Sequence, residues 1–88
     1  HKLFLSCKGV HIQRGISESN ELQALIKRKM ISIADETYLL ADHSKFGTQA
    51  LTQVAGWSDI QHVITDRLTG KDALDPIRDK GVHVRQLD

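Results

Sequence analysis

The sequence has little cysteine, and this scarcity limits both the chemistry and the setting of the protein. Cys7 is the only cysteine among the 88 residues. A single thiol has no internal disulfide partner, and no cysteine–histidine spacing matches a zinc site. Proteins without disulfides are typical of reducing compartments, so we expect a cytoplasmic location. We expect Cys7 to be a buried, inert residue rather than a nucleophile.

Long apolar runs, aromatic residues and an excess of charge are also missing or rare. No apolar run approaches the ~20 residues that a membrane-spanning helix needs. Aromatic residues make up only 5% of the chain, so the core must come from leucine, isoleucine, valine and alanine. A formal net charge of +1 gives no electrostatic case for nucleic-acid binding. The only basic run, Lys27-Arg28-Lys29, is typical of the solvated face of a helix.

Four short apolar runs predict four strands in a single domain. The first three, residues 3–7, 37–41 and 60–65, are nearly continuous and typical of buried strands. The fourth, residues 82–87, alternates apolar with polar residues and predicts an edge strand with one wet face. Residues 51–55 fit a helix or a strand equally well, and residues 43–47 predict a loop.

Two helices are predicted between these strands. Ser17 is an N-cap candidate for the first, in which Lys27 and Arg28 fall opposite an apolar face. That face consists of Leu22, Leu25, Ile26, Met30, Ile33 and Ala34. The second helix is expected to start at Asp75, with Pro76 in its first turn, and to end before Gly81.

This order of elements predicts an α/β fold. Continuous apolar strands joined by helices are typical of a Rossmann-like, mostly parallel sheet, here of about four strands with flanking helices. Ligands of such sheets bind where the strands end. Three polar segments follow the predicted strands at that edge: Ser6 to Gly9, Asp42 to Gly47, and Thr65-Asp66.

The second polar segment has groups suited to binding hydroxyls and an anion. Asp42 offers a carboxylate to sugar hydroxyls, Ser44 and the loop N–H groups suit a phosphate or hydroxyl, and Lys45 supplies a positive charge. The alternative is that Asp42 and Ser44 satisfy loop backbone groups while Lys45 is solvated. Thr65-Asp66 equally fits a local turn. The five histidines are scattered, without the spacing of a metal site.

Four segments of the chain carry a specific resemblance when they are taken together and in order. The most specific is Leu40 to Gly47, which reads LADHSKFG and resembles the L-A-D-x-S-K-F-G signature in the C-terminal domain of the DeoR family of bacterial repressors. Phe4 to Val10 followed by Gly15-Ile16, Ile60 to Asp66, and Lys80 to Val84 resemble three further family segments. The resemblance covers essentially the whole chain.

The resemblance implies a sensor of sugar phosphates. Members of the family repress sugar-catabolism operons, bind DNA through an N-terminal helix-turn-helix domain, and bind a phosphorylated sugar through a C-terminal domain similar in fold to ribose-5-phosphate isomerase. By motif match, the ligand-binding residues are Asp42, Ser44 and Lys45, joined by Lys8 and Asp66. No metal, cofactor or membrane is implied. We expect residues 1–88 to be a single-domain fragment, the C-terminal part of the sensor domain, without the DNA-binding domain.

One position departs from the family's pattern, and two alternative functions need to be considered. His11 lies in a loop that Lys8-Gly9 and Gly15 are expected to frame, and it stands where the family usually has aspartate, which puts sugar-hydroxyl contacts from that loop in doubt. An aldose–ketose isomerase is the first alternative, but residues 10–15 have no carboxylate to act as its general base. An oligomerisation module is the second, since the edges of a partial sheet invite pairing, and we expect a homo-oligomer.

Overall fold

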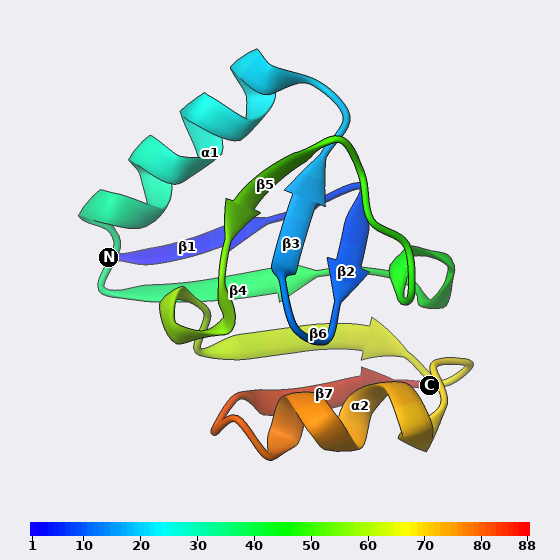
Figure 1. Cartoon of the computed structure of the whole chain (residues 1–88). Coiled ribbons are helices and arrows are strands. Elements are labelled where there is room, and N and C mark those ends of the chain that lie inside the picture. Colours follow the sequence, from blue (N-terminus) through cyan, green and yellow to red (C-terminus); the bar gives the residue numbers. More distant parts are fainter.

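The computed structural model describes residues 1–88, and a four-stranded parallel sheet lies at its centre (Figure 1). The strand order is β1-β4-β6-β7, so the predicted α/β fold with a parallel sheet is confirmed. The strands are β1 (Lys2–Leu5), β4 (Glu36–Leu40), β6 (His62–Asp66) and β7 (His83–Leu87). β7 lies at the edge of the sheet, as its alternating pattern predicted, with His83 and Arg85 exposed.

A second, antiparallel sheet of three strands was not predicted. It consists of β2 (Gly9–His11), β3 (Gly15–Glu18) and β5 (Thr52–Ala55), in the order β2-β3-β5. The expectation of a loop over residues 8–15 was therefore wrong, and the ambiguous residues 51–55 contain a strand. The hairpin needs Gly15, which has φ +86°, a conformation that side chains strongly disfavour.

The core fills the space between the two sheets. In Figure 1 the antiparallel sheet crosses one face of the parallel sheet, with α2 (Lys71–Arg78) beside it on the same face. Leu39 and Val63 from the parallel sheet, Ile16 from β3, Ala24 from α1 (Glu21–Ile33) and Ile77 from α2 have no exposed surface. The core is thus almost entirely aliphatic, as the composition predicted.

The opposite face of the parallel sheet is open. Phe4, Tyr38, His62 and His83 form a ladder of stacked rings across all four strands, with centroids 4.6, 4.1 and 5.3 Å apart. Parallel sheets usually carry helices on both faces, so this uncovered face is unusual.

Neither α1 nor α2 is long and apolar enough to cross a membrane.

The orientation of α1 is the reverse of the prediction. Leu22, Leu25 and Ile33 are 63%, 58% and 70% exposed. Lys27 points inward instead, to Glu18, so its assignment to a solvated face was wrong. Arg28 and Lys29 are exposed, as predicted, although Arg28 also donates to the carbonyl of Gln53. The apolar stripe faces away from the core because Ala24, Lys27 and Ile31 occupy the inner face.

The starts of both helices also differ from the predictions. Asn20, not Ser17, is the N-cap of α1: its side chain accepts a hydrogen bond from the N–H of Gln23, while Ser17 is buried in β3. α2 starts after Gly70, so Pro76 lies inside the helix rather than in its first turn. The helix tolerates this proline because Leu74 and Ile77, three residues apart, are both fully buried and anchor it.

Candidate functional site

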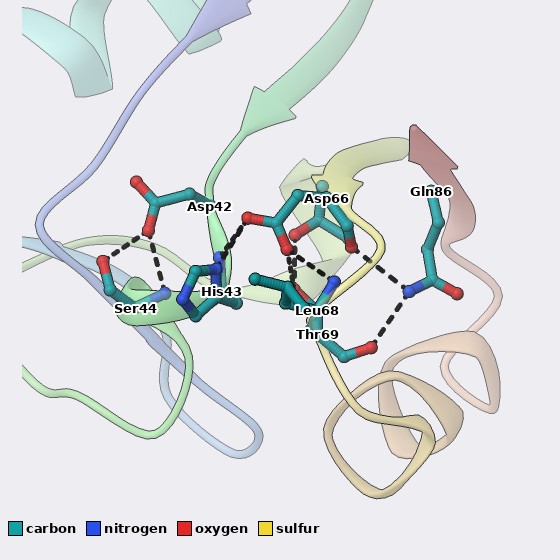
Figure 2. A network of polar contacts seen from close by, with 8 residues as sticks. Asp42, His43, Ser44, Asp66, Leu68, Thr69 and Gln86 are labelled. Atoms are coloured by element: carbon teal, nitrogen blue, oxygen red, sulfur yellow. Dashed lines mark hydrogen bonds and ion pairs between the residues drawn. The ribbon is translucent and has the colours of Figure 1, made fainter. Parts of the chain in front are cut away.

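Three polar segments meet beyond the carboxyl ends of the parallel strands, at the edge that the sequence predicted. Ser6 to Gly9 follows β1, a 3₁₀ turn (His43–Lys45) follows β4, and Asp66 ends β6. Figure 2 shows the contacts that join the last two segments to β7. These contacts decide which of the predicted side chains are free to meet a ligand.

Asp42 caps the 3₁₀ turn with one of its carboxylate oxygens. Oδ1 accepts hydrogen bonds from the N–H of Ser44, at 2.8 Å, and from the Ser44 hydroxyl. Both bonds hold the pKa of Asp42 below its usual value, the hydroxyl contributing most. Oδ2 has no partner within the protein, so it remains available to a donor such as a sugar hydroxyl.

Asp66 binds the same turn through His43. Its Oδ2 accepts hydrogen bonds from His43 Nδ1 at 2.8 Å and from the His43 N–H at 3.0 Å. Its Oδ1 accepts one from the N–H of Leu68 at 2.9 Å. The His43 side-chain bond, with the backbone bonds after it, lowers the pKa of Asp66 to about 2. Both oxygens are therefore engaged in holding the two strand ends together.

The network continues into β7 through residues that the sequence did not single out. The Gln86 side chain donates hydrogen bonds to the carbonyls of Asp66 and Thr69, at 3.2 and 2.9 Å. The hydroxyls of Thr65 and Thr69 lie 2.7 Å apart. His43 occupies the variable position of the LADHSKFG segment, so its place at the site could have been predicted from the sequence. Nothing in the sequence pointed to Gln86.

The backbone N–H groups of the turn all have partners within the protein. The His43 N–H donates to the Asp66 carboxylate and the Ser44 N–H to the Asp42 carboxylate. The Lys45 N–H donates to the Asp42 carbonyl at 3.1 Å, and the Phe46 N–H to the His43 carbonyl at 3.3 Å. The Gly47 N–H donates to the Val10 carbonyl at 2.9 Å. A phosphate at this edge must therefore be held by side chains rather than by a nest of backbone amides.

Lys8 and Lys45 are the predicted cations at this edge, where Arg67, next to Asp66, is a further exposed cation. Lys8 is exposed, Lys45 is half-buried, and neither takes part in an ion pair. Burial raises the pKa of the Cys7 thiol to about 11, although the positive charges of Lys27 and Lys45 act to lower it. The thiol is thus protonated at neutral pH, and the prediction of a buried cysteine is confirmed.

Two hollows flank the 3₁₀ turn on different sides. One, of about 320 Å³, is lined at the strand ends by Asp42, Thr65 and Asp66. The other, of about 480 Å³, lies between the β2–β3 hairpin, Phe46 and α2. No three His, Cys, Asp or Glu side chains are grouped closely enough to hold a metal ion.

Comparison with known proteins identifies the family. The family model described as "DeoR C terminal sensor domain" matches residues 1–67. The chain belongs to the DeoR C-terminal sensor domain family. The match includes all five residues that the resemblance predicted, from Lys8 to Asp66.

Several curated transcriptional regulators are similar to this sensor-domain chain. The uncharacterized HTH-type transcriptional regulator YulB of Bacillus subtilis is 42% identical over 84 residues, which cover 96% of the chain and 33% of that protein. The L-fucose operon activator of Haemophilus influenzae is 45% identical over 62 residues, 70% of the chain and 25% of that protein. The putative aga operon transcriptional repressor of Escherichia coli O157:H7 is 32% identical over 82 residues, which cover 93% of the chain and 30% of that protein. The chain spans only a quarter to a third of these relatives.

His11, at the position where the resemblance led us to expect an aspartate, closes the turn of the hairpin. Its Nδ1 accepts hydrogen bonds from the N–H groups of Gln13 and Arg14, at 3.1 and 3.2 Å. An aspartate side chain can make the same kind of bonds in an Asx turn. His11 therefore forms the turn without a carboxylate.

Replacing His43 with alanine should raise the pKa of Asp66 from about 2 toward the ordinary 3.8, because the largest cause of the lowering is removed. The pKa is lower in the folded than in the unfolded chain, so these bonds stabilise the fold above pH 4 and are lost as the pH falls toward 2. A carboxyl carbon NMR titration measures the shift. Glu36, which is bound to His62, is the internal control and should not change. An unchanged Asp66 titration in His43→Ala would contradict the assignment.

Proposed function

We propose that this chain is the effector-sensing part of a bacterial, cytoplasmic transcriptional regulator of a sugar-catabolism operon, and that it binds a phosphorylated sugar. The observation that carries the proposal is the pair of unpaired cations, Lys8 and Lys45, at a strand edge where aspartates and a serine also gather. One of the relatives is named as an L-fucose operon activator, which supports a sugar effector.

The chemistry of the edge divides the ligand into two ends. Lys45 and Lys8 supply charge for the phosphate, and charge-assisted hydrogen bonds to phosphate are the strong ones. The free Oδ2 of Asp42 accepts from sugar hydroxyls, with Ser44 beside it. Asp66 serves the site through His43, whose turn it holds in place.

Regulation follows if the ligand binds one arrangement of the regulator better than another. The population then shifts toward that arrangement, by no more than the difference in affinity allows. Operator DNA is contacted by a part of the longer protein outside residues 1–88. We expect a phosphorylated sugar to change the affinity of the full-length regulator for its operator at least fivefold, which is the lower end of typical allosteric coupling.

We do not propose an enzymatic activity for the chain, because the similar proteins are named as regulators, activators or repressors. Aldose–ketose isomerisation needs a general base at the sugar carbon, and the hairpin places His11 and Gln13, not a carboxylate, beside the larger hollow. Turnover of sugar phosphates above background would favour the isomerase alternative instead.

We also propose that the chain self-associates. Leu22, Leu25, Ile26, Met30 and Ile33 form a continuous exposed stripe along α1, and large exposed apolar patches mark contact surfaces. We expect a dimer or larger species at tens of micromolar in sedimentation analysis, and a shift toward monomer in Leu25→Lys. Thr48→Lys, at an exposed position outside the stripe, is the matched control. A monomeric wild-type chain would contradict this part of the proposal and the oligomerisation alternative together.

The test of the proposed function uses the full-length regulator with its operator and a panel of sugars. Each sugar is offered with and without its phosphate, and DNA affinity and sugar turnover are both measured. A change in DNA affinity caused by phosphorylated sugars alone, without turnover, supports a sensor. No response to any phosphorylated sugar would overturn the proposal.

A further inference from the structure

Lys27 joins three parts of the fold from the inner face of α1. Its ammonium group donates hydrogen bonds to the Ser6 carbonyl, just after β1, and to the carboxylate of Glu18 at the end of β3. The side chains of Lys27 and Glu18 are only 15% and 5% exposed. A buried ion pair is weak evidence for stability, because desolvation offsets the attraction between the charges. The Lys27–Glu18 pair is therefore better explained by its effect on the local geometry than by a contribution to stability.

The segment that Lys27 contacts is the turn carrying Lys8. On its other side this turn, residues 6–9, is clamped to β3, where the Lys8 N–H donates to the Ser17 carbonyl at 3.0 Å. Gly9 packs so closely that a Cβ there would lie 2.4 Å from the Thr48 carbonyl oxygen. The turn is therefore held between β3 and α1, and Lys27 makes the bond from the helix.

Lys27 also lies near the proposed phosphate end of the site. Its ammonium group binds the Ser6 carbonyl at one end of the turn, and the Gly47 N–H of the LADHSKFG segment binds the Val10 carbonyl, directly after the other end, at 2.9 Å. The turn therefore lies between α1 and the segment that carries Lys45.

We propose that Lys27 is a positioning residue of the sensor site: by binding Ser6 and Glu18 together, it holds the turn 6–9, and with it Lys8, in place for the ligand. The role in ligand binding rests on the proposed function, but the tethering of the turn does not. Lys27 acts through the turn and is not required to touch the ligand.

Amide hydrogen exchange tests the tether without any ligand. The double variant Glu18→Leu/Lys27→Met removes both charges, so that neither is left buried and unpaired. We expect the Lys8 amide to exchange at least tenfold faster in this variant, while the Leu39 amide at the centre of the parallel sheet does not change. The single variant Lys27→Arg keeps a donor for both Ser6 and Glu18, so the Lys8 amide should still exchange as slowly as in the wild type. Arg28→Met is the matched control, since Arg28 binds the Gln53 carbonyl, away from the turn. Unchanged exchange at Lys8 in the double variant would overturn the proposal.

Calorimetry with glucose 6-phosphate and fructose 1-phosphate as probes then tests the link to the ligand. We expect affinity at least tenfold weaker in the double variant and retained in Lys27→Arg. Faster exchange with unchanged affinity would overturn the role in the site. Failure of the wild-type chain to bind either probe would count against the proposed function, while the exchange result would still decide the tether.

Discussion

Replacing Lys45 with alanine should weaken the binding of a phosphorylated sugar by about 30-fold, measured by calorimetry. A hydrogen bond to a charged group contributes ~1.5–3 kcal/mol, and about 2 kcal/mol corresponds to that factor. The backbone N–H groups of the 3₁₀ turn already have partners, so no amide takes over the task of Lys45. The loss should be specific for the phosphorylated sugar, since Lys45 is proposed to bind the phosphate.

Lys71→Ala is the matched control for that experiment. Lys71 is an exposed cation on α2, and its Nζ lies 3.9 Å from Oδ2 of Asp75, one helical turn further along. Exposed pairs of this kind contribute little to stability, so the variant should fold and bind as the wild type does. Equal losses in Lys45→Ala and Lys71→Ala would show a general charge effect and would contradict a specific site at Lys45.

Replacing Gly15 with alanine should destabilise the fold by about 2–5 kcal/mol, measured by denaturant unfolding. A left-handed non-glycine residue costs ~1–3 kcal/mol, and forcing atoms into a filled space costs a similar amount. Gly15 has φ +86°, and a Cβ there would lie 2.1 Å from the Ala55 carbonyl oxygen of β5. Small domains have only ~5–15 kcal/mol of stability, so part of the population should be unfolded.

Gly56→Ala is the control for Gly15→Ala. Gly56 has φ −86°, and an added Cβ would meet nothing within 4 Å. Its cost should stay within ~0.5 kcal/mol, as for most surface substitutions. Similar losses in the two variants would contradict the close approach of the hairpin to β5.

The parallel sheet was predictable because its strands are continuous apolar runs. Leu39 and Val63 lie on the face that packs on the core, and they are fully buried. The antiparallel sheet was harder to predict, since β2 has three residues and β3 four, and Gly and Ser interrupt them. Gly9 and Gly15 flank a segment with two apolar residues, Val10 and Ile12, at alternate positions, and this pattern is a hairpin signal that the sequence contains.

The direction of α1 could not be predicted from its periodicity. A helical pattern shows that one face is apolar, but it does not show which surface that face meets. Lys27 faces inward because its ammonium group binds the carboxylate of Glu18 in β3 and the Ser6 carbonyl after β1. Contacts between separate elements leave no signal in the periodicity of the helix.

The candidate site was predictable as a place, and less so as a set of contacts. The strand order brings Asp42 and Asp66 to one edge, as expected for neighbouring parallel strands. That Asp66 binds through His43 depends on the side-chain geometry of two strand ends and has no signature in spacing. Whether these residues bind a ligand stays a prediction.

The most direct test of a sugar-phosphate sensor is an amide NMR titration of the chain with fructose 1-phosphate and with fructose, and with glucose 6-phosphate and glucose. We predict saturable shifts at Lys8 and at residues 42–47 with the phosphorylated sugars alone. Equal shifts with the unphosphorylated sugars, shifts confined to other parts of the chain, or no shifts at millimolar concentration would contradict the account.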